Sequence, residues 1–572
     1  MTTLAFESVL PAVARLAPVS ADPSDELQRS LSFLDANVDA ETVVQAGYGA
    51  ALVGGVLVGL CSAFVVPPLS AFVAALAAML VTAHAVHVLP VWLAALERTQ
   101  ALGSAPALVG RLVLRMRVEP SVERATLFAA RSGDGPLSSS LATHVEHARG
   151  SPRTGLGDFA AAWRSWFPAL DRAAALVETA ADAPAGERDR ALDRAHEIVR
   201  EGTRDQLASF TSEVRGPVTA VYAFGVLLPL ALVGALPAAR IAGIQLSVVH
   251  VALLYDVVLP VALVAAIGWV LARRPVAFAP VAVDTSHPAV ADHRLHALVA
   301  SIAAAAAGFV GTDLFVASWA APLAALGLGV GSGMFVVTRP VVELRDRVRG
   351  VEDGLSDVLY LVGRAINDGE AVESALVRAA TSVPGATGEL FEAAVGVQNR
   401  LRVGVVESFS GEYGVLNELP SQRVASVATL LGLAASEGRP AGHAIVAMAD
   451  QLAALNRLDL DARRELASIT ETLSNTGSIF GPLVAGATVA LADGMGPARS
   501  LDSAGVVEPL ATADLGLVVG SYVLLSAVIL TTLSVGVAHG LDRSLVAHNV
   551  GKALVSATTI FLAAFVAAGT IL

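Results

Sequence analysis

The 572-residue chain alternates between clusters of apolar stretches and two long charged segments. The charged segments occupy residues 97–215 and 339–476, and apolar stretches flank both of them on each side. A helix needs roughly 20 apolar residues to cross the hydrocarbon core of a membrane, and most of these stretches reach that length. The alternation therefore predicts a polytopic membrane protein that carries two polar domains.

Composition supports a membrane protein and excludes several other classes. Charged residues make up 16% of the chain and hydrophobic residues 54%, whereas about 25% of a soluble protein is charged. The net charge of −13 argues against a nucleic-acid partner, because phosphate contacts need clustered positive charge. Lys552 is the only lysine, which is typical of a halophilic archaeon or of simple codon bias. Cys61 is the only cysteine, so no intramolecular disulfide can form.

Nine apolar stretches meet or approach the length of a membrane span. They are residues 43–66, 69–89, 218–236, 246–271, 295–310, 318–337, 477–492, 515–537 and 553–572. The fifth and seventh are the shortest. The seventh also contains Pro482, which a membrane helix tolerates only if neighbouring groups satisfy the carbonyl that proline leaves free.

The distribution of arginine predicts the orientation of these spans. Arg273, Arg274 and Arg294 lie between the fourth and fifth spans, and Arg339 follows the sixth. The joins between spans one and two, and between five and six, contain no arginine or lysine. With nine crossings, this bias places the N-terminus and both charged segments in the cytoplasm and the C-terminus outside. Because the first 42 residues are mainly acidic, unlike a signal peptide, we expect a cytoplasmic tail there.

Both charged segments are predicted to be helical. Apolar residues recur at helical spacing in the second segment, at Leu355, Val358, Leu359, Val362 and Ile366. Neither segment alternates apolar and polar residues as a strand would, so each is expected to be an antiparallel bundle of five or six helices. The fold is then all-α, with a tail (1–42), two spans (43–89), a first cytoplasmic bundle (97–215), four spans (218–337), a second cytoplasmic bundle (339–476) and three spans (477–572).

The chain lacks the motifs of a nucleotide-driven enzyme. A phosphate-binding loop needs an early glycine and then Gly-Lys followed by Ser or Thr. The single Gly-Lys pair, Gly551-Lys552, is followed by Ala553, and Val546 stands where the early glycine belongs. We therefore predict no catalytic, cofactor or metal site and do not expect the chain to be an enzyme. A partner would have to supply any ATPase activity.

Glycines in the sixth stretch alternate at Gly327, Gly329, Gly331 and Gly333. They lie in a continuous apolar segment instead of between a strand and a helix, so a dinucleotide site is not favoured. Small residues four apart let membrane helices approach closely, and helix packing is the preferred interpretation.

A few polar residues lie within or near the spans and bundles. Asp256 in the fourth stretch could belong to an ion or proton path. An interhelical hydrogen bond is favoured, because a transporter would be expected to have more than one acid within its spans. His84 and His87 are expected at the membrane interface. His144 and His147 are three residues apart, unlike the four-residue spacing of a helical zinc site, so they are assigned to a solvated helix face.

Several segments resemble a known family. Arg215-Gly216-Pro217 leads into an apolar run at residues 222–230, Arg273-Arg274-Pro275 follows the fourth span, and residues 363–376 form a helix–turn–helix pattern around Asn367-Asp368-Gly369. Together with the paired polar segments, these resemble the type II secretion system F domain family, which includes GspF, PilC, TadC and archaeal FlaJ. The nine-span layout is similar to the archaeal members.

The resemblance implies a membrane platform that has no catalytic residues. In such a system a hexameric secretion ATPase acts on the cytoplasmic bundles, and the spans pass that motion to pilin-like subunits leaving the bilayer for a filament. Self-association into a homo-oligomer is also expected. The filament is left open between an adhesive pilus, an archaellum and a secretion pseudopilus.

Two other functions remain as alternatives. A transporter or channel would have inverted repeats within its spans and several charges near the membrane midplane. Here the two polar segments are the parts that look alike, because each has an early glycine-containing turn and ends in a long polar helix that runs into Gly-Pro, at Gly216-Pro217 and Gly481-Pro482. Charges within the spans are few. A membrane receptor scaffold is left open as well.

Overall fold

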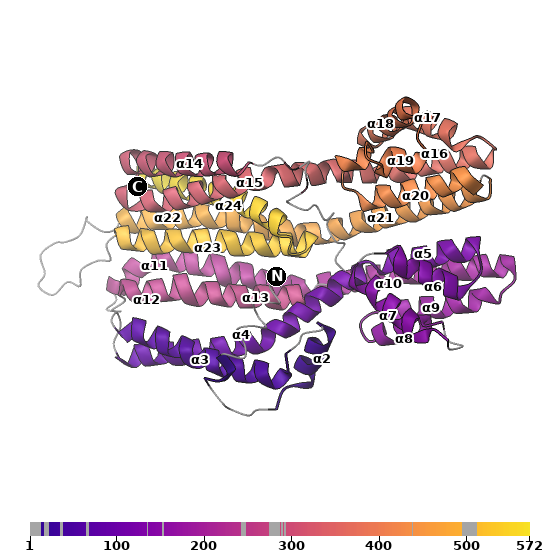
Figure 1. The fold of residues 1–572 in the computed structure, drawn as a ribbon. Helices are drawn as coiled ribbons and strands as arrows, with labels where there is room; N and C mark the ends of the chain where they lie inside the picture. Colours follow the sequence, from indigo (N-terminus) through magenta and orange to yellow (C-terminus); the bar gives the residue numbers. More distant parts are fainter. Residues whose placement is uncertain are drawn as a thin grey trace, which may run out of the picture.

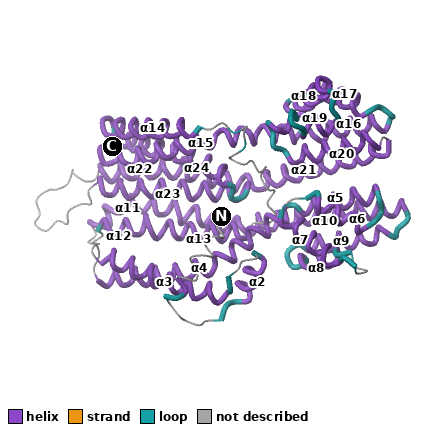
Figure 2. Tube along the Cα trace, viewed as in Figure 1, coloured by secondary structure: helices purple, strands orange, loops and turns teal. Residues whose placement is uncertain are grey.

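Helices make up the regular structure of this protein. The structure, a computed structural model, describes residues 13–16, 22–34, 38–63, 68–133, 135–150, 154–241, 247–273, 287, 290, 293–437, 439–494 and 512–571. Within these ranges helices are joined by loops and no strand occurs (Figure 2). Nine described helical runs are long and apolar enough to cross a membrane. The predicted all-α, polytopic membrane fold is therefore confirmed.

The membrane-spanning helices lie side by side in one array (Figure 1). In chain order they are α3 (Ala40–Ala63), α4 (Pro68–Gly103), α10 (Ala185–Tyr222) continued by η1 (Ala223–Leu227) and α11 (Leu228–Ile241), α12 (Val248–Ala252) continued by η2 (Leu253–Val258) and α13 (Leu259–Arg273), α14 (Arg294–Phe315), η3 (Ser318–Ala320) with α15 (Ala321–Asp353), α21 (Arg439–Asn475) continued by η5 (Thr476–Phe480) and α22 (Gly481–Gly494), α23 (Thr512–His539) and α24 (Arg543–Ile571). The helices run beyond the apolar stretches. The fifth stretch, for example, continues through polar Thr312 and Asp313 to Phe315, because polar residues end a hydrophobic run without breaking a helix.

Both polar segments form helical bundles that project from the same end of the array (Figure 1). The first bundle consists of α5 (Ala105–Val118), α6 (Val122–Arg131), α7 (Pro136–Ala148), α8 (Leu156–Trp163), α9 (Pro168–Ala181) and the first half of α10. Its apolar core includes Leu108, Met116, Phe159 and Phe167, all fully or almost fully buried. Ser121 begins α6 by accepting a hydrogen bond from the Arg124 amide at 3.3 Å, an N-cap that satisfies one of the free amides of the first turn.

The second bundle consists of α16 (Leu355–Asn367), α17 (Val372–Ser382), α18 (Ala386–Leu401), α19 (Val405–Ser410), η4 (Val415–Asn417), α20 (Gln422–Glu437) and the first half of α21. The apolar face predicted for α16 is confirmed, since all five of its residues are buried in the bundle core. Gly369 ends this helix with φ of +93°, a conformation that glycine adopts without a steric penalty. The amide of Glu370 then bonds the Ala365 carbonyl, which closes the helix end.

The glycines of α15 pack against two different helices, which confirms their predicted role. A Cβ atom at Gly331 would lie 2.8 Å from the Gly551 carbonyl oxygen of α24. A Cβ at Gly329 would lie 2.8 Å from the Ala305 Cβ of α14. Alternate glycines thus face opposite neighbours, and their small size lets α14 and α24 lie close to the backbone of α15 on its two sides.

The predicted N-terminal tail contains an ordered helix, α2 (Asp25–Phe33), within its described part. Ser24 caps this helix, and Leu27 and Leu31 are buried in a small cluster with Val43 at the start of α3. Burial of this apolar stripe holds α2 against the N-terminal spans and near the bundle end of the array (Figure 1).

Candidate functional site

Continuous helices join the two bundles to the membrane array. α15 leads from the array into the second bundle, while α10 and α21 lead from the bundles back into the array. A continuous helix transmits a push or a rotation along its length, and a break in its main-chain hydrogen bonds is a point at which it can bend. The residues that tie these helices to their neighbours are therefore the candidate functional site.

An ion pair fixes α15 where the second bundle meets the array. Arg345 Nη1 and Nη2 donate to the two carboxylate oxygens of Asp542, at 2.8 and 2.6 Å. Arg345 is buried, with 4% of its surface exposed. Asp542 also accepts hydrogen bonds from the amides of Ser544 and Leu545 and so caps the N-terminus of α24. A bidentate pair restricts both distance and angle, and it locks α15 to the turn between α23 and α24.

The surroundings of Asp542 keep its carboxylate ionised. Burial by itself would raise the pKa of Asp542, but the hydrogen bonds from Arg345, from the Ser544 hydroxyl and from the Leu545 amide outweigh it. The net result is a pKa well below the ordinary range of an aspartate. The pair therefore stays charged at any pH near neutrality.

The contact between α15 and α24 continues from this pair into the array. The ring of His548 stacks on Phe335 with centroids 4.9 Å apart, and Thr338 Oγ1 lies 3.2 Å from His548 Nδ1. Lys552 Nζ lies 5.7 Å from the centroid of the Phe335 ring, within the range of a cation–π contact. Polar and aromatic contacts thus hold the two helices together next to their close glycine contact.

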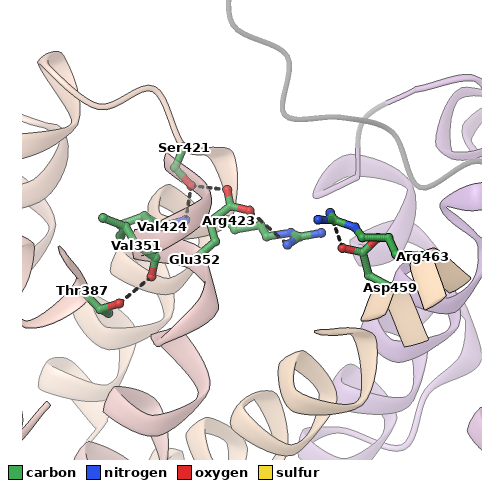
Figure 3. A network of polar contacts seen from close by, with 8 residues as sticks. All are labelled: Val351, Glu352, Thr387, Ser421, Arg423, Val424, Asp459 and Arg463. Atoms are coloured by element: carbon green, nitrogen blue, oxygen red, sulfur yellow. Dashed lines mark hydrogen bonds and ion pairs between the residues drawn. The ribbon is translucent and has the colours of Figure 1, made fainter. Parts of the chain in front are cut away.

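The end of α15 is tied into the second bundle by a buried acid (Figure 3). Glu352 accepts hydrogen bonds from the Ser421 hydroxyl at 2.7 Å and from Arg423 Nη1 at 3.0 Å. Ser421 in turn caps α20 by accepting from the Val424 amide at 3.2 Å. One carboxylate thereby joins the last turn of α15 to the first turn of α20.

One further contact supports the end of α15, and an ion pair within α21 lies opposite it. Thr387 of α18 donates to the Val351 carbonyl of α15 at 2.9 Å (Figure 3). Figure 3 also shows Arg463 and Asp459 of α21, paired at 2.6 Å, across from Arg423. The base of the second bundle is therefore held by a group of polar contacts around the end of α15.

The two bundles also touch each other. Arg204 of α10 and Asp461 of α21 form an ion pair at 2.6 Å, with both side chains partly exposed. Gly110 of α5 lies directly against the side chain of Gln451 of α21, where a Cβ atom would collide with the amide. The helices that leave the two bundles thus lie against one another before they enter the array.

An aromatic cluster fixes the first bundle to the N-terminal helices. The guanidinium of Arg98 on α4 lies 4.9 Å from the ring centroid of Phe33 and 4.8 Å from that of Trp166. Phe33 also packs edge-on against Trp163, with centroids 5.8 Å apart. In contact with both rings, Arg98 joins α2 and α4 to the turn that follows α8.

The polar groups predicted within the spans serve helix–helix contacts. Ser521 Oγ donates to Asp256 Oδ1 at 2.7 Å, which confirms the interhelical hydrogen bond predicted for Asp256. Ser556 Oγ donates to the Ser478 carbonyl at 3.0 Å. Ser478 stands four residues before Pro482, so a neighbour does satisfy the carbonyl that this proline leaves free, as its place in a span requires.

The histidines have local partners. The ring of His87 lies 2.6 Å from the Ala83 carbonyl and packs against Tyr48 of α3. His144 lies 2.8 Å from the Ser140 carbonyl and packs edge-on against Phe159. Among the described residues, no three His, Cys, Asp or Glu side chains gather where they could hold a metal ion. Gly551-Lys552 lies within α24 and not in a loop.

Sequence reasoning missed the Arg345–Asp542 pair, the Glu352 network and the Arg98 cluster. The partners in the first pair are 197 residues apart, so no local spacing relates them. One signal was present, since Arg345 occupies an apolar face of α15 with Leu344 and Val348. A charged residue on such a face needs a partner, although the sequence does not identify it.

Comparisons with protein-family models, with curated proteins and with solved structures found no match for this chain.

Proposed function

We propose that this protein is a membrane platform of a type IV pilus-like or type II-like secretion machine. It couples a hexameric cytoplasmic secretion ATPase to pilin-like subunits that leave the membrane for a filament. The observation that carries the proposal is the pair of helical bundles at one end of the array, each joined to the spans by long continuous helices.

The dimensions of these helices suit mechanical coupling. α15 has 33 residues, which corresponds to a rod of about 50 Å at 1.5 Å per residue. A hydrocarbon core is about 30 Å thick, so a substantial part of the rod extends beyond it. Arg345, Glu352 and their partners hold this extension at the array and at the bundle, so a displacement of the second bundle would reach α24 with little loss.

Charge supports a cytoplasmic location for the bundles. Arg273, at the end of α13, packs its guanidinium 4.0 Å from the ring centroid of Trp269, an arrangement typical of a membrane boundary. Arg339 lies in the middle of α15, directly after the sixth apolar stretch, and Lys552 lies in the N-terminal half of α24, directly before the ninth. Positive charge gathers on the cytoplasmic side of membrane proteins, so the bundles would face an ATPase there.

The energy source would be a separate protein. The sequence has no glycine-rich loop that ends in Lys followed by Ser or Thr, and its single Gly-Lys pair lies in a helix. The partly exposed outer helices of both bundles would provide the surface on which a motor acts.

The test is deletion of the gene followed by complementation. Loss of surface filaments on deletion, and their return with the intact gene, is the expected result under electron microscopy. Complementation with Asp542→Asn should restore fewer filaments than Arg164→Gln, which removes an exposed ion pair with Asp171 on the first bundle. Normal filaments in the deletion strain would refute the proposal.

A transporter is the competing function, and Asp256 is the observation in its favour. This acid lies within a span, half-buried, in the π-helical turn η2. Its hydrogen bond to Ser521 provides a structural role without any transported ion. Solute flux into vesicles that contain only this protein, abolished by Asp256→Asn, would favour the transporter.

A further inference from the structure

Among the described residues, three membrane helices contain a π-helical turn that precedes a proline in the same register. The turns η1, η2 and η5 end at Leu227, Val258 and Phe480, and a proline follows two residues later in each case, at positions 229, 260 and 482. Proline has no amide hydrogen, and its ring clashes with the carbonyl four residues earlier. A π turn widens the helix at that carbonyl, so the clash is relieved by a local break in the α-helical hydrogen bonds.

Proline alone does not explain these turns. Pro217 and Pro340 also lie inside long helices, α10 and α15, and there the α-helix continues without interruption. Pro217 is in the same continuous helix as η1, only a few residues before it. The broken hydrogen bonds are therefore a property of particular sites and not of every proline in this chain.

At two of these turns, a hydroxyl group of a neighbouring helix donates a hydrogen bond to the carbonyl that the proline leaves free. The Tyr522 hydroxyl of α23 donates to the Gly225 carbonyl, which stands four residues before Pro229. Ser556 of α24 donates in the same way to the Ser478 carbonyl, four residues before Pro482. Side-chain donors of this kind satisfy a carbonyl that the main chain leaves free, and they do so without restoring the main-chain hydrogen bond that would stiffen the turn.

The turns η1 and η5 occupy equivalent places in the two helices that leave the bundles. Each helix runs from a bundle, passes a π turn and then a proline, and crosses the rest of the array as α11 or α22. The two turns are neighbours, because a Cβ atom at Gly481 would lie 3.2 Å from Val226 Cγ1. Closer to the bundles, Arg204 and Asp461 join the same two helices.

The helix that leads into the second bundle is different. α15 has no π turn, and the Arg345–Asp542 pair fixes it to the turn before α24. It is therefore a rigid helix, in contrast to α21, which is followed by the π turn η5.

We propose that η1 and η5 form a paired hinge at which the helices leaving the two bundles bend relative to the membrane array. Tyr522 and Ser556 hold the hinge in the present conformation, and bending releases their hydroxyls from the carbonyls. Because Val226 and Gly481 are in contact, bending at one turn displaces the other, so the two helices bend together. The hinge deepens the proposed function by naming the part of the platform that moves.

Pulsed electron paramagnetic resonance distances in lipid nanodiscs test the hinge directly. The full chain would carry Cys61→Ala and two spin labels, one at exposed Leu295 at the start of α14 and the other at exposed Arg131 or Glu465. The first pair reports the first bundle, and the second reports α21 on the bundle side of η5. Broad distributions are expected for both pairs in the otherwise unchanged protein.

Pro229→Ala with Pro482→Ala restores the missing amides, so both distributions should lose their broad component. Pro229→Ala alone should narrow the distance distributions of both label pairs, because the two turns are in contact. Pro217→Ala, the matched change in the same helix, should leave both widths unchanged. Equal narrowing by Pro217→Ala, or no narrowing by the paired change, would overturn the hinge.

Tyr522→Phe and Ser556→Ala provide an independent test if the proline variants do not fold. Each removes one hydroxyl and should broaden the distributions, and unchanged widths would overturn the hinge. The distances do not depend on filament assembly. If the variants leave the distance distributions unchanged and the deletion strain lacks filaments, the hinge is rejected and the platform function is kept. If the variants alter the distributions but the deletion strain still makes filaments, the hinge is kept and the platform function is rejected.

Discussion

The pair between Arg345 and Asp542 predicts unequal effects for its two partners. The Arg345 side chain is 5% exposed, and its Nε has no hydrogen-bond partner among the described residues. The Asp542 side chain is 22% exposed. Its carboxylate keeps the hydrogen bonds from the Ser544 and Leu545 amides when the guanidinium is removed. Asp542→Asn therefore leaves a buried charge without a counter-ion, whereas Arg345→Leu leaves a carboxylate that still has partners.

The magnitudes follow from this difference. Removal of one partner from a buried ion pair costs about 3–5 kcal/mol, and Asp542→Asn should lie near about 3 because the asparagine still caps α24. Arg345→Leu should cost about 1–2 kcal/mol, since an apolar side chain suits a buried site and the remaining carboxylate is partly solvated. The double variant should be close to Arg345→Leu alone, because no unpaired charge remains.

Denaturant titration in mixed micelles, followed by tryptophan fluorescence, would measure these free energies of unfolding. The matched control is Arg339→Leu, which removes an exposed pair with Glu343 and should cost less than about 1 kcal/mol. An Arg345→Leu variant that is less stable than Asp542→Asn, or additive losses in the double variant, would refute the reasoning.

Two further predictions follow from the same region. The pKa of Asp542 in the folded protein lies below its unfolded value of about 4. The ionised carboxylate therefore stabilises the fold above that pH, and this stabilisation is lost as the pH falls below it. Between neutral and acidic pH, the free energy of unfolding should fall more steeply for the unchanged protein than for Asp542→Asn. Gly331→Ala should destabilise by about 1–3 kcal/mol, because the new methyl group meets the Gly551 carbonyl. Gly311→Ala, which has open space at its Cβ, should be neutral or slightly stabilising, and equal losses for both in a thermal unfolding assay would contradict the packing argument.

Local patterns in the sequence accounted for the elements of the fold. The apolar stretches predicted the positions of the spans, and the spacing of Leu355, Val362 and Ile366 predicted the buried face of α16. The four-residue spacing of Gly327 and Gly331 predicted a close helix contact. Such features depend on neighbouring residues and on transfer from water, so a short window contains the information.

The ends of the spans were less predictable. The third and seventh stretches are parts of helices that begin far out in the bundles, at Ala185 and Arg439. Hydropathy marks where a helix enters lipid and carries no signal for where the helix itself begins. Those boundaries depend on caps and on packing against other helices.

The sequence by itself determined that this chain is helical, that it crosses a membrane repeatedly and that it separates two polar segments from apolar ones. Only the tertiary structure decided which helices are neighbours, and with that the pairing of Arg345 with Asp542 and of the Tyr522 hydroxyl with the Gly225 carbonyl. The physical reason is that hydrophobicity and helical periodicity act within a few residues of chain. A pair such as Tyr522 and Gly225, 297 residues apart, is selected among many equivalent donors and acceptors by how whole helices pack.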